Sequence, residues 1–518
     1  GLPVVYAAHA SCWIAEAGEA LAEPRWLESA RKHLDWVLAQ RDPATGWFDH
    51  MGFDARDAGD RVAVTHTIAY TLWGILHSSV ILGRDDGIAA VRQAARAIAR
   101  RLELSRRLPG VLDSHWRARA SSSCLTGNAQ MALIWLRLHA MEPDVVLLNA
   151  ALKAIDDVKA AQPMMHPHPG IRGGIPGSDP VWGDYIRFAL PNWSAKFFID
   201  ALLAKRDALV AVRRRAATPW EIPSDVPLQL PPATFASGQP VRTVLYTRDG
   251  SHKVPQMVAA WSSWGFRPAA VVIETPPAPT TPQRVRARVR TDGVAPLARR
   301  LWRRPGSNGA SVPRPLAIDE MPHDVEAFCA AHRIRVVRVG KLDDPASIAA
   351  VRELRPDLAV HAGAGILRAP LLAVPRLGTL NAHMGVLPRF RGMNVTEWAT
   401  FLGGPVGCTV HLVDAGIDTG NILCVRPSDP RGARTIAELR ARVDHDQIAM
   451  LGDVIQWTQN AGTLPPSRSQ EADEGIQLFR MHPDLRAILE AELAAAPSDA
   501  SVALPSSAGT PARTMATV

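Results

Sequence analysis

The second half of the chain repeats one pattern, in which a short run rich in β-branched residues is followed by a helical segment. Such runs occur at 241–247, 269–274, 334–339, 357–362, 378–383, 407–414 and 421–425. Near-continuous apolar runs are typical of strands buried on both faces of a parallel sheet. We therefore predict that residues 241–494 form a Rossmann-like α/β domain. Its open, doubly wound sheet should bind ligands at the carboxyl ends of its strands.

The remaining segments differ from this pattern in composition. Residues 1–205 are rich in helix formers and tryptophan, whereas residues 206–240 are Pro-rich and lack periodicity, which predicts a linker. Residues 495–518 are rich in Ala, Ser, Pro and Thr, which predicts a disordered tail. A chain of 518 residues has room for two or three such domains.

The first 205 residues contain a weak internal repeat. Residues 30–40 resemble residues 151–162, and a third helical segment at 90–102 falls between them. Leu34, Ile98 and Ile155 are about 60 residues apart, which is enough for one pair of helices per repeat. The spacing predicts an all-α array of about three helical hairpins, with inner and outer helices alternating as in a partial α/α toroid.

Segments 65–76, 123–136 and 173–202 resemble six-hairpin helical proteins that act on or bind carbohydrates. The resemblance suggests a groove lined by residues near the predicted loop ends, namely His66, His115, Asp184 and Tyr185. It leaves open whether this region is an epimerase or lyase, a binding module or a structural element.

The positive charge is concentrated in one segment. The net charge is +8, and residues 281–315 contain nine arginines and a single acidic residue, Asp292. This Pro-flanked insert is suited to contact phosphates or an acidic membrane surface. A solvated basic helix is the alternative.

The cysteines and the apolar segments indicate the cellular compartment in which the protein is expected. The five cysteines are scattered and form no C-x-x-C pair, which argues against a disulfide framework and a zinc site. The first residues have no basic segment before an apolar run, and no apolar stretch reaches about 20 residues. We therefore expect a cytoplasmic protein without a metal ion. His166 and His168 lack companion ligands, and Cys408 and Cys424 are expected to pack as small apolar residues.

Polar side chains with catalytic potential follow two of the predicted strands. Asn381 and His383 are two apart at the end of the run 378–383, so their side chains share one face, and Asp418 follows the next long run. An amide and an imidazole can stabilise an oxyanion, and a carboxylate can orient the imidazole and help to move a proton. The set is suited to acyl transfer to an amine, although for an N-x-H motif alone a solvated or packed histidine is the default interpretation.

Residues 356–394 and 407–423 resemble the 10-formyltetrahydrofolate-dependent formyltransferase family. The matches are Asn381, His383, Leu387-Pro388, Arg391-Gly392 and the segment around Asp418. The resemblance implies an N-formyltransferase with Asn381, His383 and Asp418 as its catalytic residues. It also implies that the pterin of 10-formyltetrahydrofolate lies against two backbone segments, Ala364, Gly365, Ile366 and Leu367, and Asp414, Ala415, Gly416 and Ile417. His361 is placed to approach this pocket, whereas His411 is predicted to be packed.

The chain also departs from this family. Met384, Gly385 and Val386 follow His383, where many members carry a serine, and the turn at 247–253 lacks a Gly-rich phosphate loop. About 75 helical residues separate the Asp418 region from the tail, which we take to leave no room for an additional β-barrel domain and to argue against tRNA.

We expect a small amine as the acceptor, namely an amino sugar or nucleotide-sugar of surface polysaccharide biosynthesis. Methionyl-tRNA or phosphoribosylglycinamide is the alternative acceptor. A catalytically degenerate, carbohydrate-binding scaffold is a further alternative.

Overall fold

The computed structural model describes residues 4–53, 59, 61–214, 220–232, 241–275 and 325–496. Contacts divide the chain into two compact units, with the boundary after Ala216. The predicted Arg-rich insert 281–315 lies outside the described residues, as does the predicted tail from residue 497 onward. No helix in the described part of the chain is long and apolar enough to cross a membrane.

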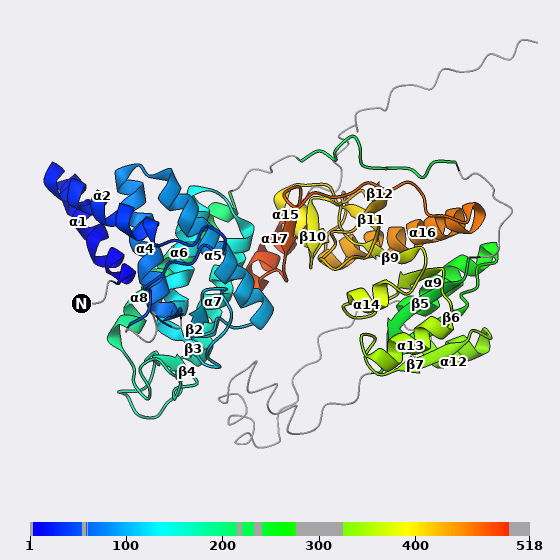
Figure 1. The fold of residues 1–518 in the computed structure, drawn as a ribbon, viewed down its shortest axis with the longest axis horizontal. Coiled ribbons are helices and arrows are strands. Elements are labelled where there is room, and N and C mark those ends of the chain that lie inside the picture. Colours follow the sequence, from blue (N-terminus) through cyan, green and yellow to red (C-terminus); the bar gives the residue numbers. More distant parts are fainter. Residues whose placement is uncertain are drawn as a thin grey trace, which may run out of the picture. The chain divides into compact units, whose positions relative to one another are not determined.

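The N-terminal unit is built from consecutive helical hairpins (Figure 1). They are α1 (Ala8–Ala20) with α2 (Pro24–Ala39), α4 (Thr65–Leu82) with α5 (Asp85–Ser105), and α6 (Leu125–Met141) with α7 (Val145–Ala161), followed by α8 (Asn192–Val212). Neighbouring helices α1, α4, α6 and α8 contact one another in that order, and α5 contacts α7. The predicted alternation of two helical layers is therefore present, whereas the ring geometry of a toroid stays a prediction.

The predicted repeat falls on equivalent helices. Leu34 lies on α2, Ile98 on α5 and Ile155 on α7, and all three side chains are buried. Each is therefore on the second helix of its hairpin, which confirms a repeating unit of one hairpin. Two short antiparallel pairs lie between the hairpins, β1 (Val62–Val64) with β2 (Val111–Asp113) and β3 (Ser123–Cys124) with β4 (Ser178–Asp179).

One buried carboxyl group of this unit makes its stability depend on pH. Burial raises the pKa of Asp157 on α7 to about 7, although Arg107 and Lys153 act in the opposite direction. Its Oδ2 atom is buried and has no hydrogen-bond partner among the described residues. The folded carboxyl group therefore binds its proton more tightly than the unfolded one, whose pKa is about 3.9, so raising the pH above 4 increasingly opposes folding until the pH passes 7.

We expect Asp157→Asn to raise the free energy of unfolding by about 1–3 kcal/mol at pH 8 and to change it little at pH 4. Urea unfolding at both pH values measures this difference. Asp156→Asn, on the neighbouring and more exposed side chain, is the matched control. A gain that is equal at the two pH values would contradict the explanation.

The C-terminal unit contains a seven-stranded sheet with the strand order β12-β11-β9-β8-β5-β6-β7. The strands are β5 (Thr243–Arg248), β6 (Ala270–Glu274), β7 (Val336–Val339), β8 (Leu358–His361), β9 (Gly378–His383), β11 (Gly407–Leu412) and β12 (Ile422–Pro427). All seven predicted runs are strands of this one sheet. The prediction of a parallel sheet is correct for β9, β8, β5, β6 and β7.

The sheet is not parallel throughout, which corrects the sequence-based prediction. Strand β11 is antiparallel to both β9 and β12. The reason for the β11–β12 pairing is the short connection 413–421, because a parallel crossover needs a dozen or more residues. The domain is therefore a mixed, parallel-rich sheet.

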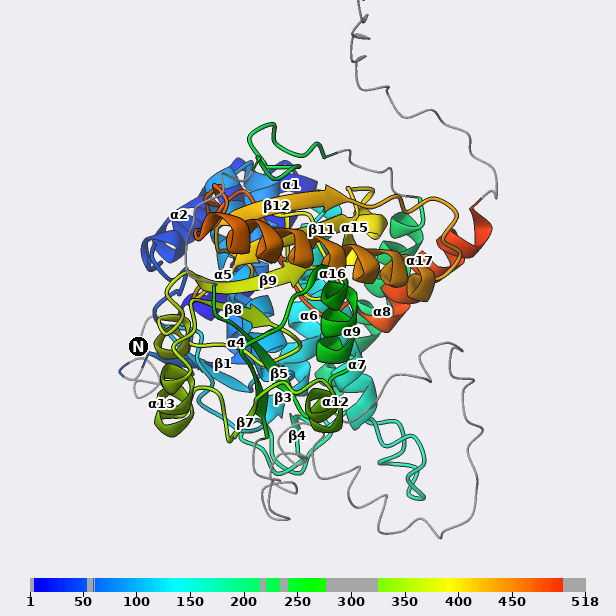
Figure 2. The ribbon, with the colours of Figure 1, turned by 90° about the vertical axis from the view of Figure 1, so that its right-hand side faces the viewer.

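Helices cover both faces of this sheet. On one face, α13 (Pro345–Glu353) and α14 (Ala369–Leu372) pack against apolar side chains of β5, β6 and β8. On the other, α16 (Ile436–Ala461) crosses β9, β11 and β12 and contacts α9 (Lys253–Trp261), with α12 (Val325–Ala331) beyond it (Figure 2). Between β9 and β11 the chain forms β10 (Phe390–Gly392), which pairs with β13 (Ile476–Leu478), and α15 (Val395–Leu402), which contacts α17 (Pro483–Ala495).

The predicted linker 206–240 differs from the structure in two described segments. Helix α8 continues to Val212, and residues 220–232 pack on the C-terminal unit. Val226 is buried among apolar residues that include Val386 and Val425, and the Pro227 carbonyl accepts a hydrogen bond from the Val425 N–H at 2.8 Å. Residues 220–232 lack a periodic pattern because their backbone is irregular. A few large apolar residues and backbone hydrogen bonds hold this segment against the C-terminal unit.

Candidate active site

Two neighbouring strands present the predicted catalytic side chains on one face of the sheet. Asn381 and His383 lie at the end of β9, and His411 of β11 is the register partner of Asn381. Asp418 lies in the loop between β11 and β12, with φ of 54°. A non-glycine residue in this left-handed region is uncommon, and such conformations cluster at functional sites.

The loop brings Asp418 to both histidines. Asp418 Oδ2 lies 3.4 Å from His383 Nδ1, and Asp418 Oδ1 lies 3.6 Å from His411 Nε2. The Asn381 side chain donates from Nδ2 to His411 Nε2 at 3.1 Å. The three residues predicted from sequence therefore surround a fourth, His411, which links the amide to the carboxylate.

The hydrogen-bond partners fix the proton positions of the two imidazoles. The Phe390 carbonyl oxygen, which can only accept, lies 2.8 Å from His383 Nε2, so this nitrogen carries a hydrogen. The Leu412 carbonyl oxygen lies 2.7 Å from His411 Nδ1 and fixes a hydrogen there in the same way. In neutral rings, His383 Nδ1 therefore faces Asp418 without a hydrogen, and His411 Nε2 accepts from Asn381.

In His383 and Asp418, burial and the neighbouring charges shift the pKa in opposite directions. Burial lowers the pKa of His383, while the Asp418 carboxylate and the Phe390 carbonyl act to raise it. Burial also acts to raise the pKa of Asp418, but the charges of His383 and His411 and the Gly392 N–H hold it well below its usual range. At neutral pH, the site therefore contains an ionised carboxylate beside a neutral imidazole that can accept a proton at Nδ1.

Two glycines leave space that this arrangement needs. The Gly392 N–H donates to Asp418 Oδ2 at 2.9 Å, and its φ of 103° is a conformation that favours glycine. A Cβ atom at Gly385 would lie 2.8 Å from His383 Nε2 and 2.9 Å from the Phe390 carbonyl oxygen. A larger residue at position 385 would therefore collide with the His383 imidazole and the Phe390 carbonyl.

Gly385→Ala is expected to displace the imidazole and to lower turnover about 10-fold to 100-fold, because a misplacement of about 1 Å can cost this much. Turnover and the thermal unfolding midpoint of the variant together separate displacement from unfolding. Gly340→Ala is the control, since a Cβ atom there would meet only Asp344 Oδ2, at 3.6 Å. Wild-type turnover in a folded Gly385→Ala protein would refute the packing argument.

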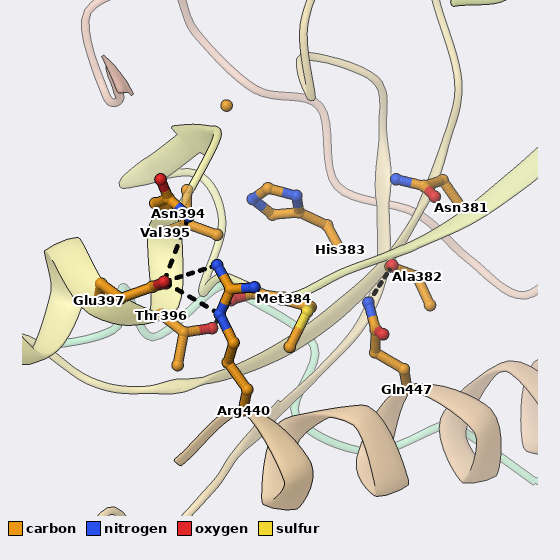
Figure 3. A pocket seen from close by; sticks show the side chains of 11 residues that line it. Asn381, Ala382, His383, Met384, Asn394, Val395, Thr396, Glu397, Arg440 and Gln447 are labelled. Carbon is orange, nitrogen blue, oxygen red and sulfur yellow. Dashed lines mark hydrogen bonds and ion pairs between the residues drawn. The ribbon is translucent and has the colours of Figure 1, made fainter. Parts of the chain in front are cut away.

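A cavity of about 230 Å³ lies on one side of His383 (Figure 3). Most of its side chains are polar, and within it Arg440 Nε of α16 donates to Glu397 Oε1 of α15 at 2.9 Å. Gln447 Nε2 donates to the Ala382 carbonyl oxygen, which ties α16 to β9. The lining residues are Asn381, Ala382, His383, Met384, Gly392, Asn394, Val395, Thr396, Glu397, Arg440 and Gln447.

The two segments predicted to hold the pterin are not among the lining residues of this cavity. Residues 364–367 follow β8, and residues 414–417 follow β11. Each presents an exposed apolar side chain, Ile366 and Ile417, whereas Leu367 is buried. His361, at the end of β8, lies 3.2 Å through Nε2 from the Gly365 carbonyl oxygen, and burial lowers its pKa while this hydrogen bond and the charge of Asp418 oppose the shift.

Several residues of the site carry no functional prediction from the sequence. His411 is predicted to be packed, and it is buried, but it also contacts Asn381 and Asp418. The pairing of β11 with β9 is the signal that reveals it, because His411 and Asn381 are partners on the same face. Glu397, Arg440 and the Phe390 carbonyl have no detectable signal, since their roles depend on how β10, α15 and α16 fold back.

Of the four residues predicted to line a groove in the N-terminal unit, the structure brings two into contact. The rings of His66 and Tyr185 lie 5.2 Å apart, and His66 Nδ1 lies 2.8 Å from Gln130 Oε1. Asp184 instead contacts Ser122 and Arg187, and the backbone N–H of His115 donates to Asp113. A cavity of about 220 Å³ lies among α1, α4, α6 and α8 and is lined by none of these four residues. Its lining residues are His9, Trp13, Ala69, Tyr70, Trp73, Gln130, Leu133, Lys196, Phe197 and Asp200.

The cysteines and the candidate metal ligands have simple environments. All five cysteines are free and buried, so Cys408 and Cys424 are packed as predicted. Burial raises the pKa of the Cys424 thiol. Among the described residues, no three His, Cys, Asp or Glu side chains gather in a way that could hold a metal ion. His166 Nδ1 accepts a hydrogen bond from the backbone N–H of His168.

A family model and several curated proteins match the part of the chain that contains this site. Residues 313–455 match the family model described as formyl transferase. The methionyl-tRNA formyltransferase of Ruminiclostridium cellulolyticum is 36% identical over 155 residues, which cover 29% of this chain and 48% of that protein. The methionyl-tRNA formyltransferase of Acetivibrio thermocellus is 37% identical over 130 residues, 25% of this chain and 40% of that protein. The chain thus spans less than half the length of these two relatives.

Solved structures were matched at lower identity. Glycinamide ribonucleotide transformylase 1 from Symbiobacterium toebii gives a TM-score of 0.31 at 19% identity, over 47% of this chain and 100% of that one. A sugar N-formyltransferase from Shewanella sp. gives a TM-score of 0.30 at 15% identity, over 48% of this chain and 87% of that one.

Proposed function

We propose that the C-terminal unit transfers the formyl group of 10-formyltetrahydrofolate to an amine. The observation that carries the proposal is the cluster of Asn381, His383, His411 and Asp418, which lies within the segment that matches the formyl transferase family. The amide, the imidazole and the carboxylate are the groups that acyl transfer to nitrogen requires, and they meet beside a cavity.

The residues around the site fit the donor. Ile366 and Ile417 expose apolar side chains on two loops near the strand ends, and such surface suits a flat ring. Ala364 and Ala415 are small and let a ring approach the backbone, whereas the space beside Gly365 and Gly416 is taken by the Arg248 and Thr419 side chains. We therefore assign the pterin to residues 364–367 and 414–417, and the acceptor to the cavity beside His383. The donor supplies an activated formyl group attached to nitrogen.

The side chains then have distinct tasks. His383 accepts the proton of the attacking amine at Nδ1, and Asp418, 3.4 Å away, stabilises the imidazolium that results. Asn381 donates from its amide to the formyl oxygen as negative charge develops there, and the imidazolium adds positive charge nearby. His411 holds the Asn381 amide in position. The proton on His383 returns to the departing nitrogen when its bond to the formyl carbon breaks.

The acceptor is proposed to be an amino sugar or nucleotide-sugar in surface polysaccharide biosynthesis. The polar lining of the cavity supports a hydroxylated amine, and the resemblance of the helical unit to carbohydrate-acting proteins supports the pathway. Methionyl-tRNA is the second candidate, supported by the names of the relatives. The methionyl side chain is apolar, however, and would leave the polar groups of this cavity unpaired.

Release of tetrahydrofolate on mixing the full chain with 10-formyltetrahydrofolate and an acceptor tests the proposal. Amino sugars, nucleotide-linked amino sugars, methionyl-tRNA and phosphoribosylglycinamide form the acceptor panel. Acceptor-dependent release identifies the class. Binding of a folate analogue without release for any acceptor would instead favour a catalytically degenerate scaffold, in which the aromatic cavity of the helical unit holds the ligand.

A further inference from the structure

Glu397 is a buried carboxylate that the proposed chemistry does not use. It lies on α15, with 1% of its surface exposed, and it lines the same cavity as Asn381 and His383 (Figure 3). Its Oε1 atom accepts hydrogen bonds from Arg440 Nε at 2.9 Å and from Asn394 Nδ2 at 3.2 Å. Its Oε2 atom is buried and has no hydrogen-bond partner among the described residues.

The unpaired Oε2 atom of Glu397 lowers the stability of the folded protein unless a ligand or water donates to it. A buried, unpaired polar atom destabilises the folded state, and more so where the group is charged. Because Arg440 and Asn394 hold the other oxygen, the carboxylate cannot rotate to satisfy both atoms at once. The side chain is thus held with one buried acceptor atom unpaired among the described residues and its charge balanced by Arg440.

We propose that Glu397 selects the acceptor by receiving a hydrogen bond from a hydroxyl group next to the reacting amine. A carboxylate oxygen can only accept, so the partner must be a donor. The cavity has a volume of about 230 Å³, which is room for about seven waters, or a single ring-sized group. A hydroxylated ring that carries an amine supplies both the nucleophile at His383 and a donor for Glu397.

This inference rests on the proposed formyl transfer and adds the feature of the acceptor that is recognised. A site built around a hydrogen bond to a substrate hydroxyl rejects analogues that lack it, because its own buried group then stays unpaired. Glu397 is thus a specificity residue, distinct in its task from His383 and Asp418.

The test combines one enzyme variant with one change in the acceptor. In Glu397→Gln, Arg440 and Asn394 retain the side-chain oxygen, so the amide NH₂ replaces Oε2 and turns an acceptor into a donor. Arg440 is 41% exposed and stays solvated without its partner. Glu490→Gln, on an exposed pair with Arg486, is the matched control for the loss of one carboxylate.

For an aminohexose acceptor, Glu397→Gln is expected to raise KM about 10-fold to 100-fold and to leave kcat within about 3-fold. For the analogue that lacks the hydroxyl next to the amine, wild type and Glu397→Gln should have similar kcat/KM. Equal losses for both acceptors, or an unchanged KM, would overturn the proposal and leave Oε2 to a bound water.

Failure of the proposed function has a different signature, because the wild-type chain then transfers no formyl group to any acceptor. In that case, calorimetric titration of the full chain with glucosamine and with its deoxy analogue decides the inference. Weaker binding of glucosamine by Glu397→Gln than by wild type and by Glu490→Gln supports it. Equal binding by all three proteins, or no binding by wild type, refutes it.

Discussion

Glutamine in place of His383 is expected to lower the rate of formyl transfer by about 10²–10⁴. The glutamine side chain would keep a donor for the Phe390 carbonyl but could not accept the amine proton at the position of Nδ1. Because burial lowers the pKa of His383, the wild-type kcat/KM should fall only below pH 6.5, as the imidazole becomes protonated.

The pH profile separates loss of the proton acceptor from general damage. Residual activity of His383→Gln should lack the acid limb that wild type shows, while folate-analogue binding stays near the wild-type value. His445→Gln, on an exposed part of α16, is the matched control and should retain both rate and profile. A His383→Gln protein with wild-type turnover would remove the imidazole from the mechanism.

Asp418→Asn is expected to lower turnover by about 10²–10³, because the imidazolium that forms on His383 loses the charge that stabilises it. The asparagine amide is neutral, so it cannot offset positive charge on His383 and His411. Its oxygen can still accept the hydrogen bond from the Gly392 N–H. Asp453→Asn, in an exposed pair with Arg426, is the control for the loss of a negative charge.

The same substitution has a predictable effect on stability. The pKa of Asp418 is lower in the folded than in the unfolded chain, so its carboxylate stabilises the fold above the unfolded pKa of about 3.9. That contribution is lost as the pH falls towards the depressed pKa. The difference in unfolding free energy between wild type and Asp418→Asn should therefore be largest at pH 5–7 and shrink below pH 4. A difference that grows in acid would contradict the assignment.

Short-range patterns in the sequence are sufficient to predict much of the fold. All seven apolar runs are strands, and those of β5 and β6 are buried on both faces of the sheet. The repeat marked by Leu34, Ile98 and Ile155 is the second helix of each hairpin. Strand direction is not predictable from these runs alone. Whether β11 runs parallel or antiparallel depends on pairing with β9, which is a contact between segments far apart in the chain.

The site shows the same limit. Asn381 and His383 share a face because of strand geometry, which the sequence reveals directly. Glu397 and Arg440 meet only because α15 and α16 pack together, and the Phe390 carbonyl is a backbone group that no residue pattern identifies. The sequence predicts a linker at residues 220–232 because irregular backbone has no period, although their apolar residues pack on the sheet.

Because β11 runs antiparallel to β9, the loop after β11 has to bring Asp418 to the site. Since Leu412 pairs with Leu380, β11 ends beside the start of β9, and the loop must turn back across the sheet to reach His383. A Cβ atom at Gly420 in this loop would lie 1.9 Å from the Leu412 carbonyl oxygen. The carboxylate is thus held by a surface turn rather than by the sheet. Changes confined to that turn offer a route by which selection could retune the proton transfer while the core stays as it is.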